Sequence, residues 1–399
     1  MRGRWRDGAL IGAAALGIAG VMGAPASGQT IEPAAADRVA RLNQALGRHE
    51  RTLRRDPRTG YLTSVLDALG VPPESQLLVF SKTGVQRAYT SPHNPRAIYF
   101  DQSVAVGYAP GAPVIEVAAH DPQQGVVFYT VDQTAAAPIF TRQTSCLSCH
   151  VSSSTLGVPG LIARSNTVGE DGRVMEPSGT HDVDHQTPHP DRWGGWFVTS
   201  EDAAPPYQQL AHRGNITFSG KGNTSNQIFV DWLNSAPETR GYLSPSSDIV
   251  GLLLFDHQVH AINLMTKLAF EARASSRNVD RLAIELADYF LFAGEAPPLA
   301  PLTPRPGFAA RLESAVPADH RGRSFGQLNM DTRLLRYPCS YMIYADAFAA
   351  LPASIKETVY RRMIGVLSTP DPRATRAQLD DRQAVLEILS ETKSDFPAR

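Results

Sequence analysis

The sequence predicts an α+β fold with a β-rich N-terminal part, an irregular middle and a helical C-terminal part. Short runs of β-branched and aromatic residues, separated by turn residues, fill residues 76–132. Apolar residues recur at helical spacing in most of the chain after residue 226. Between these parts, residues 135–225 are rich in glycine, proline and histidine and show little periodicity. We therefore expect a helix pair with a β-rich domain at 37–134, and a helical domain at 226–399 that packs on the middle region.

The N-terminal end has the features of a cleaved export signal. Arg2, Arg4 and Arg6 precede an apolar run at 9–23, which ends in a stretch of small residues. This run is shorter than the ~20 residues that span a bilayer, and no second run of ~18 apolar residues follows. We assign residues 1–28 to a signal peptide and expect a periplasmic or secreted protein with no transmembrane segment in the mature chain.

The composition excludes several classes of protein. The 38 basic and 39 acidic residues give a net charge of −1, which provides no basic face for nucleic acid. Hydrophobic residues make up 42% and charged residues 19%, so wholesale disorder, a coiled coil and a multi-span membrane protein are not expected. Only 3 cysteines occur, too few for a disulfide scaffold.

Local periodicity predicts the individual elements. Helical spacing indicates two helices between residues 37 and 69, broken near 57–60. Five β-rich runs follow and predict an antiparallel meander, at residues 77–80, 97–100, 104–108, 114–117 and 126–131. The C-terminal part predicts further helices at residues 226–233, 246–273, 279–292, 354–367 and 376–389. We expect the proline-rich segment 297–306 to be an ordered spacer rather than a helix.

The middle region contains Cys146-x-x-Cys149-His150, the attachment sequence of a c-type haem. Residues three apart share one face of a helical turn, so both sulfurs can reach one edge of the porphyrin while His150 ligates the iron. The sequence therefore predicts one covalent haem c with His150 as its proximal ligand. A single motif argues against the di-haem peroxidase type. Cys339 is then the odd cysteine, and we expect it to be a buried thiol that packs as a small apolar side chain.

Three other uses of the two cysteines stay open. A thioredoxin-like redox pair would require a βαβ context, and here a β-rich segment precedes the motif. A structural disulfide between residues three apart would close a very short loop and stabilise little. A zinc site would need further ligands, which nearby histidines could supply.

The sixth iron position decides between an electron carrier and a protein that binds small molecules. The first group of candidate ligands follows the motif in a loop region and comprises Met175, His181, His185, His189 and His212. Of these we favour His185 and Met175, and the adjacent Asp184 is placed to orient the His185 ring. Arg192, beside two tryptophans, either pairs with a haem propionate or is a surface arginine next to an aromatic core strand.

A second group of candidates lies on the predicted helix 246–273, which has almost no polar face and should be central and buried. His257 and His260 share one stripe of this helix, so at least one imidazole should lie in the interior beside Asp256. Such a histidine is either a core residue whose ring nitrogens are hydrogen-bonded, or part of a distal haem pocket or metal site.

Several segments together resemble a family of exported bacterial cytochrome c domain-containing proteins that carry a single Cys-x-x-Cys-His motif. The matching segments are 146–150, 155–160, 184–185, 192–196, 212–215 and 336–341. The resemblance covers about residues 76–367, and it implies haem binding without implying a particular role. Small class I cytochromes carry their motif near the mature N-terminus, so the position here argues against their fold and their methionine ligand.

The sequence leaves three hypotheses of function. The first is a periplasmic mono-haem c-type cytochrome that transfers electrons to a redox partner protein, which the sequence does not identify. The second is a mono-haem oxidoreductase or a peroxide- or gas-binding protein with an open sixth iron position, in which His257 or His260 acts as acid or base. The third is a zinc-stabilised exported binding module.

Overall fold

A computed structural model describes residues 34–169, 171–175, 180–199, 241–244, 246–303 and 306–397 of the chain. Residues Ala35–Arg399 group as one compact unit. The expected signal peptide and the expected helix at 226–233 lie outside the described residues.

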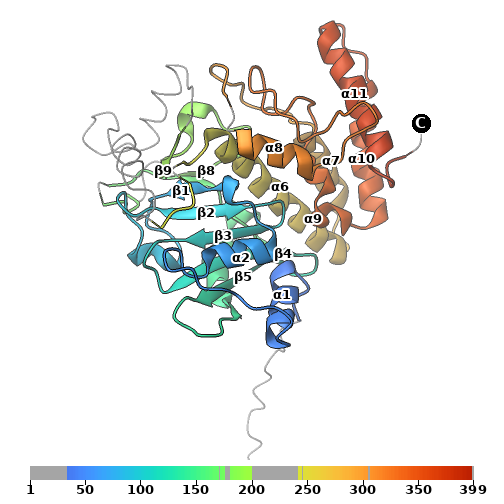
Figure 1. The fold of residues 1–399 in the computed structure, drawn as a ribbon. Coiled ribbons are helices and arrows are strands. Elements are labelled where there is room, and N and C mark those ends of the chain that lie inside the picture. The colour runs from blue at the N-terminus through green and yellow to red at the C-terminus, as the bar shows by residue number, and fades with distance from the viewer. Residues whose placement is uncertain are drawn as a thin grey trace, which may run out of the picture. The chain divides into compact units, whose positions relative to one another are not determined.

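A seven-stranded antiparallel sheet forms the centre of this unit (Figure 1), with the strand order β6-β5-β4-β3-β2-β1-β9. Its strands are β1 (Leu77–Val79), β2 (Arg96–Phe100), β3 (Val104–Tyr108), β4 (Val114–Asp121), β5 (Gly125–Asp132), β6 (Phe140–Arg142) and β9 (Trp196–Phe197). Consecutive strands from β1 to β6 pair antiparallel, which confirms the predicted meander. The two edge strands β6 and β9 were not predicted, because their few residues lie in the middle region, which shows little periodicity.

Each face of the sheet carries its own hydrophobic cluster, since successive side chains of a strand point to opposite faces. Helices α1 (Arg38–Gly47) and α2 (Leu62–Leu69) pack on one face, against Tyr99 and Val106. The opposite face, with Phe100 and Phe128, packs on the helical part of the chain. The predicted helix pair and the predicted α+β class are therefore confirmed.

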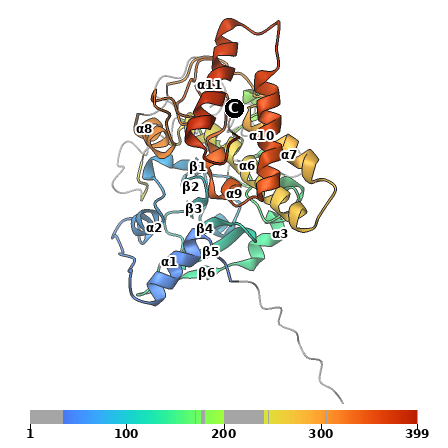
Figure 2. The same cartoon turned by 90° about the vertical axis from the view of Figure 1, so that its right-hand side faces the viewer.

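Helix α6 (Ile249–Arg273) is the central helix of the second cluster, and most of its residues are buried. The helices around it are α7 (Val279–Phe290), α8 (Pro306–Ala315), α9 (Asp346–Ala349), α10 (Ala353–Ser368) and α11 (Arg376–Thr392), as Figure 2 shows from the side. Helix α8 was not predicted. It starts at the end of the proline-rich segment, where a proline is tolerated because the first helical N–H has no partner. None of the helices in the described ranges is long and apolar enough to cross a membrane.

His120 on β4 gives the fold a predicted sensitivity to acid. Its Nδ1 is buried without a hydrogen-bond partner in the described part of the chain, and burial lowers the pKa of the imidazole to about 4. An unfolded histidine has a pKa near 6.5, so between pH 6.5 and 4 the unfolded chain binds the extra proton. The contribution of neutral His120 to stability is thus present above pH 6.5 and is lost as the pH falls towards 4.

We expect His120→Gln to flatten the fall of the free energy of unfolding between pH 6.5 and 4, by up to about 1.4 kcal/mol per pH unit. Urea denaturation at several pH values measures this slope. The exposed His93→Gln serves as the matched control. An unchanged slope in His120→Gln would contradict the prediction.

Candidate functional site

Cys146 and Cys149 lie on one short helical segment that follows the edge strand β6. A 3₁₀ turn (Thr144–Cys146) continues directly into helix α3 (Leu147–His150), and Cys146 itself has right-handed helical backbone angles. The two side chains therefore leave the same face of one turn. Cys146 is half-buried, Cys149 is exposed, and both thiols are free, so the disulfide alternative does not describe this structure.

The His150 ring is held in one orientation by a backbone carbonyl. Its Nδ1 lies 2.8 Å from the carbonyl oxygen of Gly160, and its ring centroid lies 4.5 Å from that of Phe128 on β5. A carbonyl oxygen can only accept, so Nδ1 carries the proton. Burial lowers the pKa of the imidazole, which keeps the ring neutral at pH 7. Nε2 therefore keeps its lone pair, and no hydrogen bond within the described ranges engages it.

Gly160 is itself fixed by helix α6. Its N–H donates to the carbonyl of His150 at 3.0 Å, so the two residues are joined by two hydrogen bonds. The next residue, Leu161, pairs its N–H and its carbonyl with the Asn263 side chain at 2.9 and 2.8 Å. A Cβ on Gly160 would lie 2.3 Å from Asn263 Oδ1, so only glycine allows this close approach. Helix α6 thus sets the position of the carbonyl that orients His150.

We expect Asn263→Leu to lower the free energy of unfolding by about 1–3 kcal/mol, because it leaves the N–H and carbonyl of Leu161 without partners. Urea denaturation measures the change. Asn43→Leu is a matched control, since Asn43 makes the same pair of hydrogen bonds with the backbone of Phe140, at 2.9 and 3.0 Å. Both variants should lose similar stability. A negligible cost for Asn263→Leu would contradict the role given to this side chain.

A buried pair of histidines lies on and beside helix α6. His185 Nδ1 is 2.8 Å from His257 Nδ1, and the two residues are 2% and 0% exposed. His257 Nε2 is 2.6 Å from Ser340 Oγ, so both ring nitrogens of His257 have partners. The Tyr289 ring stacks on His257 at 5.0 Å and its hydroxyl donates to the His257 carbonyl. Burial lowers the pKa of both histidines, to about 4 for His185, so the pair is neutral at pH 7.

Arg192 lies inside the protein, so of its two alternatives the surface arginine is wrong. Its Nη1 lies 3.5 Å from Asp256 Oδ2, and these side chains are 1% and 6% exposed. Its Nε and Nη2 donate to the carbonyls of Thr187 and His185 at 2.8 and 3.0 Å. The tryptophans next to it are buried, and the second of them begins strand β9. Arg192 therefore fixes the loop that carries His185.

Asp184 does not orient His185 as predicted. Its carboxylate accepts the N–H of Gln186 at 2.8 Å and the hydroxyl of Thr187 at 3.4 Å, so it closes its own turn. The His185 ring is held by His257 instead. Asp184 and His185 begin a turn whose backbone is closed by the hydrogen bond from the Thr187 N–H to the Asp184 carbonyl. The Asp184 carboxylate bonds groups of this turn, so the neighbouring position gave a wrong expectation.

A very small cavity adjoins the histidine pair, lined in part by His185, His189, Arg192 and Glu295. Its volume of about 10 Å³ is near the minimum for one water molecule. Burial lowers the pKa of His189 to about 4 and raises that of Glu295. With its small volume, the cavity has no room for an organic ligand.

The other candidates for the sixth iron position make contacts of their own. The ring of His260 packs on Tyr289 with centroids 4.7 Å apart. The N–H of Met175 donates to the carbonyl of Thr167 at 2.9 Å. His212 lies outside the described residues. No hydrogen bond or ring contact within the described residues joins His150 to the candidates His185, Met175, His257 or His260, and the sixth ligand stays a prediction.

Cys339 is fully buried in the second hydrophobic cluster, as predicted. Burial alone raises the pKa of its thiol well above the usual range, so it is unreactive. In the described part of the chain, no three histidine, cysteine or acidic side chains come together in a way that could hold a metal ion. The zinc hypothesis thus gains no support from these residues.

Sequence reasoning missed the partners that position the ring nitrogens. Gly160 and Asn263 hold His150, while Ser340 and Tyr289 hold His257. The only available signal was Asn263, a polar residue in an almost entirely apolar helix. Ser340 and Tyr289 lie 83 and 32 positions from His257 in sequence, and Gly160 lies 10 positions from His150 in a loop without periodicity.

Comparisons of the chain with protein families, with curated proteins and with solved structures found no match.

Proposed function

We propose that this chain is an exported mono-haem c-type cytochrome. Cys146 and Cys149 hold the haem through thioethers, and His150 is the proximal iron ligand. The observation that supports this most directly is the hydrogen bond from His150 Nδ1 to the Gly160 carbonyl. Histidines that ligate metals almost always donate their other ring N–H in this way, because the bond fixes both the tautomer and the ring orientation.

The two thiols fit the covalent chemistry. Each adds across one vinyl group, so that a carbon–sulfur bond forms, the S–H bond breaks and its hydrogen moves to the other vinyl carbon. No electron is gained or lost in this addition. Cys149 is exposed and Cys146 is half-buried, and both are on one turn. A covalently held haem supplies reversible one-electron chemistry at its iron.

The protein around the motif suggests how a redox partner reaches it. Cys149 is exposed, and Val151, two residues later, is an apolar side chain that is 42% exposed. A redox partner has to approach the attachment edge, and apolar side chains are common in the buried core of a protein interface. We assign partner docking to this edge. The proposal also places the mature chain in the periplasm or outside the cell, where covalent attachment prevents loss of the cofactor.

A mono-haem oxidoreductase or a peroxide- or gas-binding protein is the second candidate. It is favoured by the hydrogen bonds of the histidine pair, because both nitrogens of His257 and Nδ1 of His185 already have partners. A histidine so engaged would have to leave this network to ligate iron. That cost favours a sixth position that is open or weakly held.

Absorbance of the protein exported from a host with haem-attachment machinery tests both candidates. We expect a Soret band that resists acid–acetone extraction. Low-spin bands that CO and cyanide leave unchanged would favour electron transfer, whereas a shift with CO would favour the second candidate. Absence of any extraction-resistant pigment would overturn both.

A further inference from the structure

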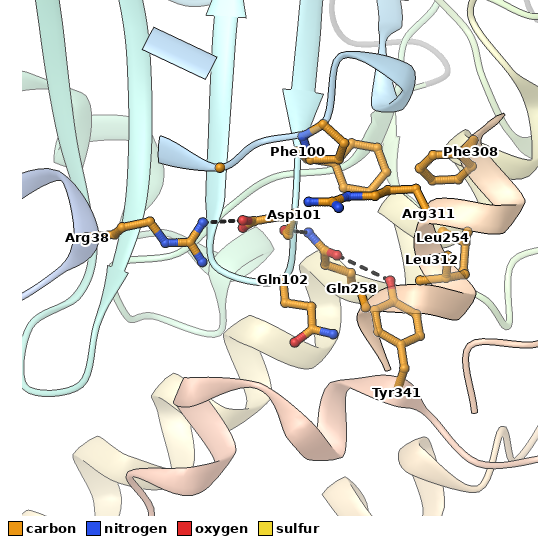
Figure 3. A pocket seen from close by; sticks show the side chains of 13 residues that line it. Arg38, Phe100, Asp101, Gln102, Leu254, Gln258, Phe308, Arg311, Leu312 and Tyr341 are labelled. Atoms are coloured by element: carbon orange, nitrogen blue, oxygen red, sulfur yellow. Dashed lines mark hydrogen bonds and ion pairs between the residues drawn. The ribbon is translucent and has the colours of Figure 1, made fainter. Parts of the chain in front are cut away.

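A pocket of about 220 Å³ lies where helices α6 and α8 meet the turn between β2 and β3 (Figure 3). Among its lining residues are Phe100, Gln102, Gln258, Phe308, Arg311 and Tyr341. The pocket shares no lining residue with the Cys146–His150 segment or with the histidine pair, so it is separate from the site described above.

The wall of the pocket is apolar and rigid. The rings of Phe100 and Phe308 are buried, with centroids 6.1 Å apart. The Gln258 amide donates to the carbonyl of Asp101 at 2.5 Å and accepts from the hydroxyl of Tyr341 at 3.2 Å. Because both ends of this amide are already bonded, it holds the wall in place and offers little to a ligand.

The mouth of the pocket carries an uncompensated positive charge. Arg38 forms an ion pair with Asp101 and also donates to the Leu69 carbonyl, so these two charges cancel. Arg311 is the remaining charged residue of the lining. Figure 3 shows its side chain running beside the Phe100 ring towards the Asp101 turn.

Two polar groups at the mouth lack partners. Within the described ranges, the Arg311 guanidinium makes no hydrogen bond or ion pair, and the Gln102 side-chain amide makes none either. Glu74 lies close to Gly307 at the start of α8, yet no ion pair joins it to Arg311. The lining therefore presents a free guanidinium beside the Phe100 ring, while the free Gln102 amide lies on the other side of Gln258 (Figure 3).

We propose that this pocket binds a small organic monoanion, namely a carboxylate carried on a single flat ring. The Arg311 guanidinium can bind a carboxylate through two parallel hydrogen bonds. The rings of Phe100 and Phe308 contact the flat body of the ligand. The volume lies below the 300–1,000 Å³ of pockets for drug-sized ligands, which suits one ring.

Calorimetric titration of the exported holoprotein with benzoate tests the proposal. We expect saturable binding that Arg311→Gln weakens by at least about tenfold, the loss of a charge-assisted hydrogen bond. Arg311 is exposed, so this substitution should leave the fold intact. Arg376→Ala removes another exposed arginine, on α11, and should leave the affinity unchanged. Benzamide has the same shape without the charge and should bind more weakly, and acetate should do so because it lacks the ring.

The proposal is overturned by no saturable binding of benzoate at millimolar concentration, by equal affinity for benzamide, or by unchanged affinity in Arg311→Gln. The Soret band is recorded in parallel. A benzoate-dependent Soret shift that persists in Arg311→Gln would place the anion at the iron and would also overturn it. The haem proposal is judged by extraction-resistant pigment alone, so the two can fail independently.

Discussion

Replacing Cys146 and Cys149 together by alanine is expected to abolish covalent haem attachment completely. Both thioethers require a free thiol, and these are the two thiols that lie on one turn next to His150. The expected result is loss of all pigment that resists acid–acetone extraction, measured by the Soret band and by haem staining of a denaturing gel. Either single variant keeps one thiol and should retain a reduced amount.

Cys339→Ala is the matched control, because it removes the third thiol of the chain from the buried core. It should keep the full amount of attached haem even though it costs stability. Thermal unfolding of the double variant checks that the fold persists, which is expected since the motif lies at the surface. Pigment that survives extraction in the double variant would contradict attachment through these cysteines.

The predicted parts of the fold are those with a strong local pattern. The runs around Ile98, Val106 and Val117 alternate or are continuously apolar between turn residues, so the meander follows from the sequence. Strand β9 is different, because Trp196 and Phe197 pair with β1 across more than a hundred residues. Pairing between segments so far apart leaves no periodic pattern in the local sequence. Helix α8 was missed for a related reason, since prolines at 297–306 hide its start at Pro306.

In the candidate site, too, the residues of a local motif could be predicted and their distant partners could not. The attachment motif is local, so Cys146, Cys149 and His150 could be named from their spacing. The groups that give these residues their chemistry are distant in sequence. Asn263 bonds Leu161, next to Gly160, across 102 positions, and Arg192 pairs with Asp256 in the interior rather than lying at the surface. Long-range partners are chosen by tertiary packing, which a single sequence does not display.

The second large effect is expected at Arg192 and Asp256. Asp256→Ala should lower the free energy of unfolding by about 3–5 kcal/mol, because it leaves a guanidinium buried without a counter-charge. Urea denaturation at pH 8 measures the loss. Arg281→Ala, which breaks the exposed pair of Arg281 with Glu285 on α7, is the matched control and should cost less than about 1 kcal/mol.

The Arg192–Asp256 ion pair contributes less to the free energy of unfolding than the single variant suggests. Burial raises the pKa of Asp256 to about 7 although a guanidinium lies 3.5 Å away, so desolvation of the carboxylate outweighs the attraction. Removing both charges should then cost less than the two single changes added together. In a double-mutant cycle, we expect the double variant Arg192→Met/Asp256→Ala to lose about 1–3 kcal/mol less free energy of unfolding than that sum. Additivity within about 0.5 kcal/mol would show that the two side chains act independently and would contradict a coupled buried pair.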